Sequence, residues 1–256
     1  MTQSPPPGWT VPLRTIVIAT LQRSGSNLLG ELMVQTGLLG RPGEFFNPFA
    51  LRATYPGQGK TLTERFELAR QHGATANGVV AIKLFPEYVP TLQSGFRFSE
   101  WFGTPVWVWL RRRDLLAQAI SLSLAREQGS YISANAPKRE PTYSAQGIYN
   151  TMRELASRNI RWEVYFARTG IAPIPIYYEE IESDPDRVIR AIGDAAGIEL
   201  GNFRSAPPAQ FQKQRTACNA EWAERFRSEL GDPDLFGIDV PRDRWRNIKR
   251  RLGLLR

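Results

Sequence analysis

The sequence predicts an α/β domain with a central parallel sheet flanked by helices on both faces. The expected strands are continuous apolar runs, which is typical of strands buried on both sides, and each is followed by a helical pattern. With 256 residues the chain is long enough to bury a full core, and it shows no internal repeat or low-complexity linker. We therefore expect a flexible Pro-rich leader at residues 1–12 and one domain over residues 13–256.

Four strands are expected, and each ends just before a polar or glycine-containing segment. Their ranges are 14–21, 78–85, 104–110 and 174–178. The last range contains Pro175, which has no backbone N–H to donate, and this places the strand near an edge of the sheet.

Helices are expected where apolar residues recur with a period near 3.6. Thr61 and Glu64 resemble a capping box, Asp184 precedes a proline, and Gly37 is a stop signal. The expected helices cover residues 24–36, 61–71, 115–126, 145–169 and 184–196. Between them we expect a loop at 40–59 and a long polar lid at 129–143. After residue 196 we expect irregular structure that ends in a basic helix at 242–256.

Charge and rare residues limit the classes of function. A formal charge of +8 indicates an anionic ligand or simply a solvated basic surface, and the absence of an aromatic-interleaved basic repeat disfavours nucleic acid. A single cysteine and a single histidine exclude an internal disulfide and a multi-histidine metal site. We expect His72 in a surface loop. The chain has no signal-peptide pattern and no apolar run of ~18 residues, so we expect a soluble cytoplasmic protein.

The loop after the first strand, residues 22–27, has the features of an anion site. In an open parallel sheet, ligands bind beyond the carboxyl ends of the strands, and this loop leads directly into a helix N-terminus. Arg23 supplies charge, Ser24 and Ser26 supply hydroxyl groups, and Gly25 allows close backbone approach. The loop lacks the Walker lysine and the G-x-G-x-x-G pattern. A helix cap with a turn explains the motif equally well.

A second junction follows the third strand. Arg112 ends that strand, and Gln118 and Ser121 lie one turn apart on the next helix. Taken alone, this is a basic strand end with Asp114 as a helix cap. Two such junctions in one sheet indicate a ligand with two separated anionic groups.

Three motifs carry a resemblance to a known family: QRSGS, GRPGEFF and RRD-x-x-x-Q-A-x-S. Together with the GVVAIKL strand and the later Gln214…Glu221-Trp222, they resemble the bacterial trehalose sulfotransferases. Those enzymes belong to the sulfotransferases that use 3′-phosphoadenosine 5′-phosphosulfate (PAPS) and release adenosine 3′,5′-bisphosphate. The resemblance spans most of the chain and implies a P-loop-like sulfotransferase fold and a homodimer.

The resemblance also implies roles for individual residues. It implies that Arg112 and Ser121 hold the 3′-phosphate and that Glu44 is the general base. The residues implied to bind the 5′-phosphosulfate are Arg23, Ser24, Gly25, Ser26 and Asn27. The residues implied to face the acceptor sugar are Gln22, Arg41, Pro42, Gly43, Glu44, Phe45, Phe46 and Asn47. Asn27 departs from the family's usual threonine, and Arg113 stands where a proline is common.

These residue types suit sulfuryl transfer. Arg23 and the helix N-terminus can meet the charge on the transferred group, so no metal is expected. A sugar hydroxyl needs a base, and Phe45 and Phe46 would shield Glu44 and raise its basicity. Lys83 is expected either to neutralise the acceptor pocket or sulfuryl group, or to extend its ammonium group to water. Lys213, Gln214 and Arg215 either close over the nucleotide or form a solvated run.

Other interpretations remain open from the sequence. The acceptor is a carbohydrate, with trehalose suggested by resemblance alone, or a glycolipid. The basic helix at 242–256 packs on the protein or contacts an anionic membrane peripherally, and packing is favoured. The rivals to the sulfotransferase interpretation are a P-loop kinase-like phosphotransferase and a non-catalytic module that binds anionic glycans or nucleotides.

Overall fold

The computed structural model describes residues 4–93, 96–128, 140–206 and 217–229. Contacts divide the chain into two compact units, Met1–Arg113 with Arg158–Pro208, and Asp114–Ser157 with Ala209–Arg256. Most of the expected lid at 129–143, the run at 213–215 and the basic helix at 242–256 lie outside the described residues. In the part of the chain that is described, no helix combines the length and apolar character that crossing a membrane requires.

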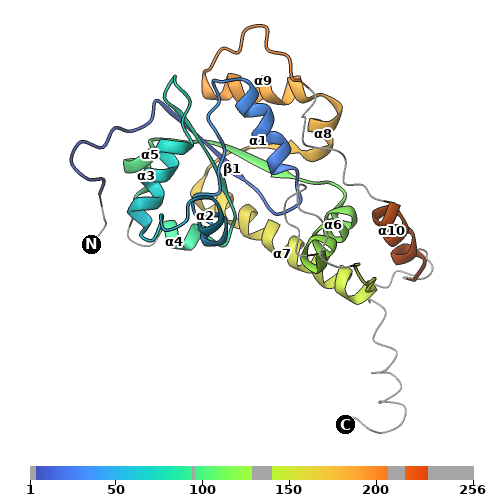
Figure 1. Ribbon diagram of the computed structural model, residues 1–256. Coiled ribbons are helices and arrows are strands. Elements are labelled where there is room, and N and C mark those ends of the chain that lie inside the picture. Colours follow the sequence, from blue (N-terminus) through green and yellow to red (C-terminus); the bar gives the residue numbers. More distant parts are fainter. Residues whose placement is uncertain (1–3, 94–95, 129–139, 207–216, 230–256) are drawn as a thin grey trace. The chain divides into compact units, whose positions relative to one another are not determined.

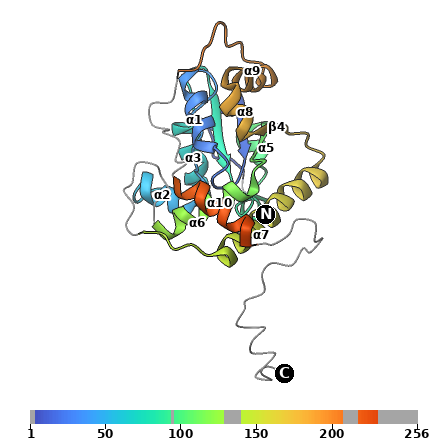
Figure 2. The same ribbon diagram turned by 90° about the vertical axis from the view of Figure 1, so that its right-hand side faces the viewer.

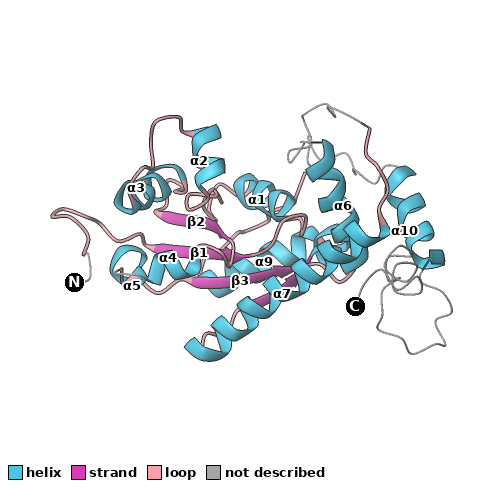
Figure 3. Ribbon diagram, turned by 90° about the horizontal axis from the view of Figure 1, so that it is seen from below, coloured by secondary structure: helices cyan, strands magenta, loops and turns pink. Residues whose placement is uncertain are grey.

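A four-stranded parallel sheet forms the centre of the first unit, as the apolar runs predicted (Figure 3). Its strands are β1 (Arg14–Ala19), β2 (Val79–Leu84), β3 (Val106–Arg111) and β4 (Ile174–Tyr177), in the order β2-β1-β3-β4. The order confirms that the strand containing Pro175 is an edge strand. All carboxyl ends therefore meet at one edge of the sheet, where the two predicted anion-binding junctions begin.

One face of the sheet is covered by α1 (Ser26–Gln35), α8 (Tyr178–Ser183) and α9 (Pro185–Ala196) (Figure 1). Ile16 and Ile18 of β1 point to this face, where Leu29 of α1 and Ile189 of α9 are fully buried. Burial of such side chains contributes roughly 1.5–3 kcal/mol each. The first helix after β1 is thus fixed to the sheet along its length, and its N-terminus is held at the sheet edge.

The opposite face is aromatic. Trp107 of β3 contacts Trp162 and Phe166 of α7 (Ala145–Thr169), with ring centroids 6.1 and 5.7 Å apart. Nearby, Thr15 of β1 donates its hydroxyl proton to the carbonyl oxygen of Phe102 in α5 (Phe98–Phe102), at 2.8 Å. Helices on both faces confirm the predicted α/β architecture.

The helices expected from the sequence form, with small shifts of their ends. α1 begins at Ser26 rather than at residue 24 because Gly25 is its N-cap with φ +88°. α3 (Leu62–His72) begins after its N-cap Thr61, whose hydroxyl accepts the N–H of Glu64. α9 begins after its N-cap Asp184. The prediction for His72 was wrong, because it is the last residue of α3 and its ring lies 4.7 Å from that of Tyr55.

Several helices were not expected. α2 (Pro48–Thr54) lies inside the expected loop at 40–59, and α10 (Ala217–Glu229) lies in the segment expected to be irregular. Asn47 and Pro48, an N-cap residue followed by proline, were a start signal for α2. α8 follows β4 without a gap, and α4 (Val89–Gln93) and α5 are a single turn or slightly more.

The second unit is helical in its described part. It contains α6 (Leu115–Gln128), the first half of α7, and α10, which lies beside α6 (Figure 2). Arg126 of α6 forms two hydrogen bonds to the carboxylate of Glu154 in α7, at 2.9 and 2.7 Å. Tyr143 packs edge-to-face on Trp222 of α10.

Candidate functional site

The loop between β1 and α1 has the backbone geometry of an anion site. Arg23 has φ +61° and is the one non-glycine residue with positive φ in the described ranges. Gly25 also has positive φ and caps α1 without any side-chain hydrogen bond to the helix N-terminus. The first N–H groups of α1 and the positive end of its dipole therefore remain available to an anion at the carboxyl edge of the sheet.

Ser24 stabilises this loop from inside. Its hydroxyl lies 2.6 Å from the hydroxyl of Thr20 and donates to the carbonyl oxygen of Leu21 at 2.8 Å. The residue is 1% exposed, and the Trp162 indole N–H bonds the Thr20 carbonyl oxygen at 3.2 Å. Because the Ser24 hydroxyl points into the protein, any contact with an anion would come from its backbone N–H. Ser26, also buried, is the first residue of α1.

Arg112 and Tyr178 approach the same loop from the ends of β3 and β4. Nη1 of Arg112 donates to the carbonyl oxygen of Arg23 at 3.5 Å, and its guanidinium lies 4.8 Å from the centroid of the Tyr178 ring. A side chain at Gly25 would clash with the Tyr178 ring. Sequence reasoning did not single out Tyr178, although it directly follows the end of a strand at the ligand edge.

The two arginines repel each other. Burial lowers the pKa of Arg23, and the nearby charge of Arg112 lowers it further. An anion between them would relieve this repulsion, since opposite charges in a partly buried site attract strongly. The loop between β1 and α1 thus brings together two guanidinium groups, the open N-terminus of α1 and a turn with positive φ.

The segment containing Glu44 lies along the end of β2. Gly43 forms an isolated parallel bridge with Ile82, and its carbonyl oxygen accepts the N–H of Lys83 at 2.8 Å. The N–H of Arg41 bonds the carbonyl oxygen of Gly73 at 2.8 Å. These bonds fix the backbone on both sides of Pro42, so the position of Glu44 is set by the sheet.

Lys83 connects Glu44 with the start of α1. Its ammonium group donates to Oδ1 of Asn27 at 2.7 Å and lies 3.9 Å from Oε1 of Glu44. The Lys83 side chain is 10% exposed and that of Glu44 is 25% exposed. Lys83 therefore points inward between two side chains rather than into water. Burial lowers the pKa of Lys83, and the charge of Glu44 opposes that shift.

Phe45 and Phe46 are core residues, each 2% exposed. Phe45 stacks on Tyr55, and Phe46 packs edge-to-face on Phe66 of α3. Their rings anchor the middle of the Glu44–Asn47 turn in the core, and their predicted contact with an acceptor sugar stays a prediction. Asn47 at the end of this turn donates from its Nδ2 to Oε2 of Glu44 at 2.8 Å.

The structure also gives the burial and position of the remaining residues predicted from the sequence. Arg41 is exposed, and Gln22 and Pro42 are half-buried. Ser121 lies on α6 in the second unit and is buried. That helix is capped by Asp114, whose Oδ1 accepts the N–H of Ala117 at 2.8 Å. The first unit thus brings together residues 22–27, Arg112, Lys83 and the Glu44 turn.

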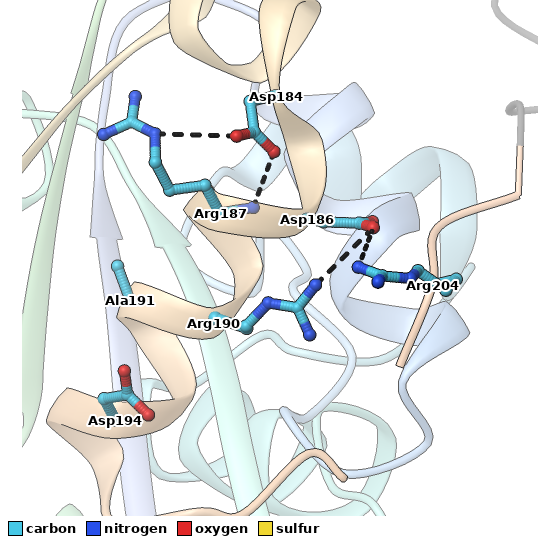
Figure 4. Close-up of a pocket in the computed structure, with 7 residues that line it drawn as sticks. All are labelled: Asp184, Asp186, Arg187, Arg190, Ala191, Asp194 and Arg204. Atoms are coloured by element: carbon cyan, nitrogen blue, oxygen red, sulfur yellow. Dashed lines mark hydrogen bonds and ion pairs between the residues drawn. The ribbon is translucent and has the colours of Figure 1, made fainter. Parts of the chain in front are cut away.

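A separate hollow of about 390 Å³ lies along α9 (Figure 4). Asp184 pairs with Arg187, and Asp186 pairs with Arg190 and Arg204, so most of the charged side chains that line the hollow are paired with one another. None of the residues predicted for the site lines this hollow. Across the described ranges, no group of three or more His, Cys, Asp or Glu side chains is arranged to hold a metal ion.

Comparison with known proteins adds independent information. The model of one protein family, described as Stf0 sulphotransferase, matches residues 15–229. Trehalose 2-sulfotransferase from Mycobacterium tuberculosis is 29% identical over 85% of this chain and 96% of its own length. Trehalose 2-sulfotransferase from Mycolicibacterium smegmatis is 25% identical over the same shares of the two chains. These matches confirm the resemblance that the motifs predicted.

A solved structure is also similar at low level. The sulfotransferase domain of the Synechococcus PCC 7002 olefin synthase has a TM-score of 0.44 and 17% identity, covering 95% of this chain and 94% of its own. A likeness of this size carries no argument about the site.

Proposed function

Because this chain belongs to the Stf0 sulphotransferase family, we propose that it moves a sulfuryl group from PAPS to a hydroxyl of a carbohydrate or glycolipid. The observation that supports this most is a single cluster in the first unit. The open N-terminus of α1, Arg23 and Arg112 lie at one end of it, and Glu44 is linked to the same helix through Lys83 and Asn27.

Each group has a role in the proposed reaction. The N–H groups at the start of α1 and the guanidinium of Arg23 bind the 5′-phosphosulfate and stabilise charge that develops on the leaving oxygen. Arg112 and Ser121 are assigned to the 3′-phosphate. Asn27 offers its amide N–H₂, because its Oδ1 already accepts from Lys83.

Glu44 is the proposed general base. The hydroxyl of the acceptor gives its proton to the carboxylate while its oxygen bonds to sulfur. The bond between sulfur and the bridging phosphate oxygen breaks, and adenosine 3′,5′-bisphosphate leaves. A disaccharide such as trehalose is the first acceptor to test, because both curated relatives are named for it.

The proposed donor can be tested by calorimetry. We expect adenosine 3′,5′-bisphosphate to bind without added metal, and we expect Arg112→Ala to weaken that binding about tenfold or more, since it removes a charged contact. Binding of ATP with Mg²⁺ and no response to the bisphosphate would overturn the proposal in favour of phosphoryl transfer.

The proposed base can be tested by one isosteric change. Glu44→Gln should bind the bisphosphate normally and lose about 10²–10⁴-fold in turnover, the range of general-base contributions. The control is Glu67→Gln, an exposed glutamate on α3, which should keep full turnover. Full turnover in Glu44→Gln would remove Glu44 as the base, and no turnover in any form would favour a binding module.

Three further predictions from the sequence remain proposals. They are a homodimer, a cytoplasmic location, and peripheral membrane contact through residues 242–256, which lie outside the described part of the chain. Sedimentation of the full chain, with and without anionic vesicles, would test self-association and membrane contact together.

A further inference from the structure

We propose that Asn47 is a positioning residue that holds one carboxylate oxygen of Glu44, so that the other oxygen receives the acceptor's proton. This inference rests on the proposed function, in which Glu44 is the base. The contact that carries it is the hydrogen bond from Nδ2 of Asn47 to Oε2 of Glu44, at 2.8 Å.

The orientation of the Asn47 amide is fixed by the helix that follows it. Asn47 is the N-cap of α2, and its Oδ1 accepts the N–H groups of Phe49 at 3.1 Å and Ala50 at 3.4 Å. A reversed amide would break this cap and set an oxygen against the carboxylate. The N–H₂ group must therefore face Glu44, so the position of α2 fixes the orientation of Asn47 and, through it, that of the Glu44 carboxylate.

The backbone holds the two residues at the same spacing. The N–H of Asn47 bonds the carbonyl oxygen of Glu44 at 3.0 Å, which closes a tight turn. The two residues inside this turn, Phe45 and Phe46, are buried in the core. The ends of the turn are thus joined twice, once through the backbone and once through side chains, while its middle is anchored in the core.

The two oxygens of Glu44 have different surroundings. Oε2 is held by Asn47, whereas Oε1 lies 3.9 Å from the Lys83 ammonium, which is longer than a hydrogen bond. Oε1 can therefore accept a proton without giving up a hydrogen bond. Tyr88, in the segment after β2, is a further titratable group near Glu44, and its pKa is raised by burial and by the charges of Glu87 and Glu44.

Two substitutions separate the cap from the carboxylate contact. Asn47→Ser keeps an N-cap oxygen but removes the N–H₂ donor, and Asn47→Asp keeps the cap but presents a second carboxylate to Glu44. We expect Asn47→Ser to lower kcat about tenfold with unchanged bisphosphate binding and unchanged Tm. In a plot of kcat/KM against pH, the fall on the acid side should occur at a pH higher by about half a unit to one unit than in the wild type. Asn47→Asp should shift further in the same direction.

The control is Asn150→Ser on α7, where the amide oxygen accepts from Gln146. It makes the same chemical change in the second unit and should leave kcat and the pH profile unchanged. Asn47→Ala, which loses both cap and donor, should match Asn47→Ser in its pH profile but have a lower Tm.

The outcomes distinguish this inference from the proposed function. An inactive Glu44→Gln together with a shifted pH profile in Asn47→Ser supports both. An inactive Glu44→Gln with wild-type kcat and pH profile in Asn47→Ser overturns the role of Asn47 and leaves Glu44 as the base. A fully active Glu44→Gln removes Glu44 as the base but leaves sulfuryl transfer standing, and the positioning role of Asn47 falls with the base.

Discussion

Gly25 combines two constraints that only glycine meets. Its φ of +88° is strained for any L side chain, and the ring of Tyr178 occupies the place of a Cβ. Gly37, at the other end of α1, has φ +66° but nothing within 4 Å of a Cβ. The two positions therefore separate backbone strain from steric exclusion.

We expect Gly37→Ala to cost about 1 kcal/mol of stability through strain alone. Gly25→Ala should cost about 1–3 kcal/mol more, because the Tyr178 ring must also move, and it should weaken bisphosphate binding. Urea denaturation and calorimetry measure the two effects. Equal losses in the two variants would show that the ring does not confine the loop.

At Lys83, the proposed role in turnover and the stability of the folded protein make opposite demands. Its ammonium group is buried beside Asn27 and Glu44, and burial lowers its pKa. Removing one partner of a buried ion pair is destabilising when it leaves a buried charge, but the Glu44 side chain is 25% exposed, and the lowered pKa of Lys83 means that the Lys83 charge itself disfavours folding. We expect Lys83→Met to be as stable as the wild type or up to about 1 kcal/mol more stable, yet to lose turnover about 10²-fold. Exposed Lys60→Met is the control and should change neither.

The direction of the pKa shift of Lys83 also fixes a pH dependence. A lowered pKa means that the unfolded chain holds this proton more tightly, so the wild type gains stability as pH rises from the lowered folded value toward the usual ~10.4. Lys83→Met lacks this gain. As the pH rises, the wild type should therefore gain stability relative to Lys83→Met. A stability difference that stays constant up to pH ~10 would show that burial of the ammonium group does not lower the pKa of Lys83.

Sequence reasoning predicted which candidate residues lie at the carboxyl edge of the sheet better than it predicted the orientations of their side chains. It placed Lys83 at the ligand edge because a strand's end can be read from an apolar run, and the structure puts it there. It took the Ser24 hydroxyl to face the ligand, whereas that hydroxyl bonds Thr20 and Leu21. Which way a side chain turns depends on neighbours distant in sequence, such as Trp162, and no local pattern contains them.

Long helices and buried strands were the most predictable elements. The helix at 145–169 was predicted to the residue, because its apolar stripe continues over many turns. α2 was missed although Asn47 and Pro48 marked its start, because seven residues carry too little periodicity to outweigh the surrounding glycines and prolines. That omission mattered, since α2 is the helix that orients Asn47 toward Glu44.

α9 offers a direct test of a helix cap. Oδ1 of Asp184 accepts the N–H of Arg187 at 3.0 Å, and Pro185 occupies the first turn. Asp184→Ala should lower the free energy of unfolding by about 1 kcal/mol, whereas Asp184→Asn should keep most of it because asparagine caps equally well. Chemical denaturation measures both, and equal losses would assign the effect to the ion pair with Arg187 instead.

The charge of the whole chain bears on the proposed donor. With a formal charge of +8 and two arginines at the first loop, the protein should attract a highly anionic nucleotide from solution. Raising the salt from about 0.05 M to about 0.5 M should weaken bisphosphate binding roughly tenfold, because the Debye length falls well below 10 Å. Salt-independent affinity, measured by calorimetry, would mean that backbone N–H groups rather than net charge dominate recognition.

The architecture as a whole followed from the sequence because strand burial and strand–helix alternation are global patterns. Strand order did not follow from them, since nothing local states that β1 lies between β2 and β3. The prediction that the strand containing Pro175 lies at an edge of the sheet rested on one missing N–H group, and it was confirmed.

That missing N–H has a consequence for the behaviour of the protein at high concentration. Among the strands that the structure describes, β4 pairs with β3 alone, so its outer side is a row of backbone groups open to pairing. Exposed rows of this kind recruit further strands and lead to aggregation. Pro175 interrupts the row in the middle of a four-residue strand, so an incoming chain finds no continuous template. If two copies associate, we expect them to join through side-chain surfaces rather than by extending the sheet across β4.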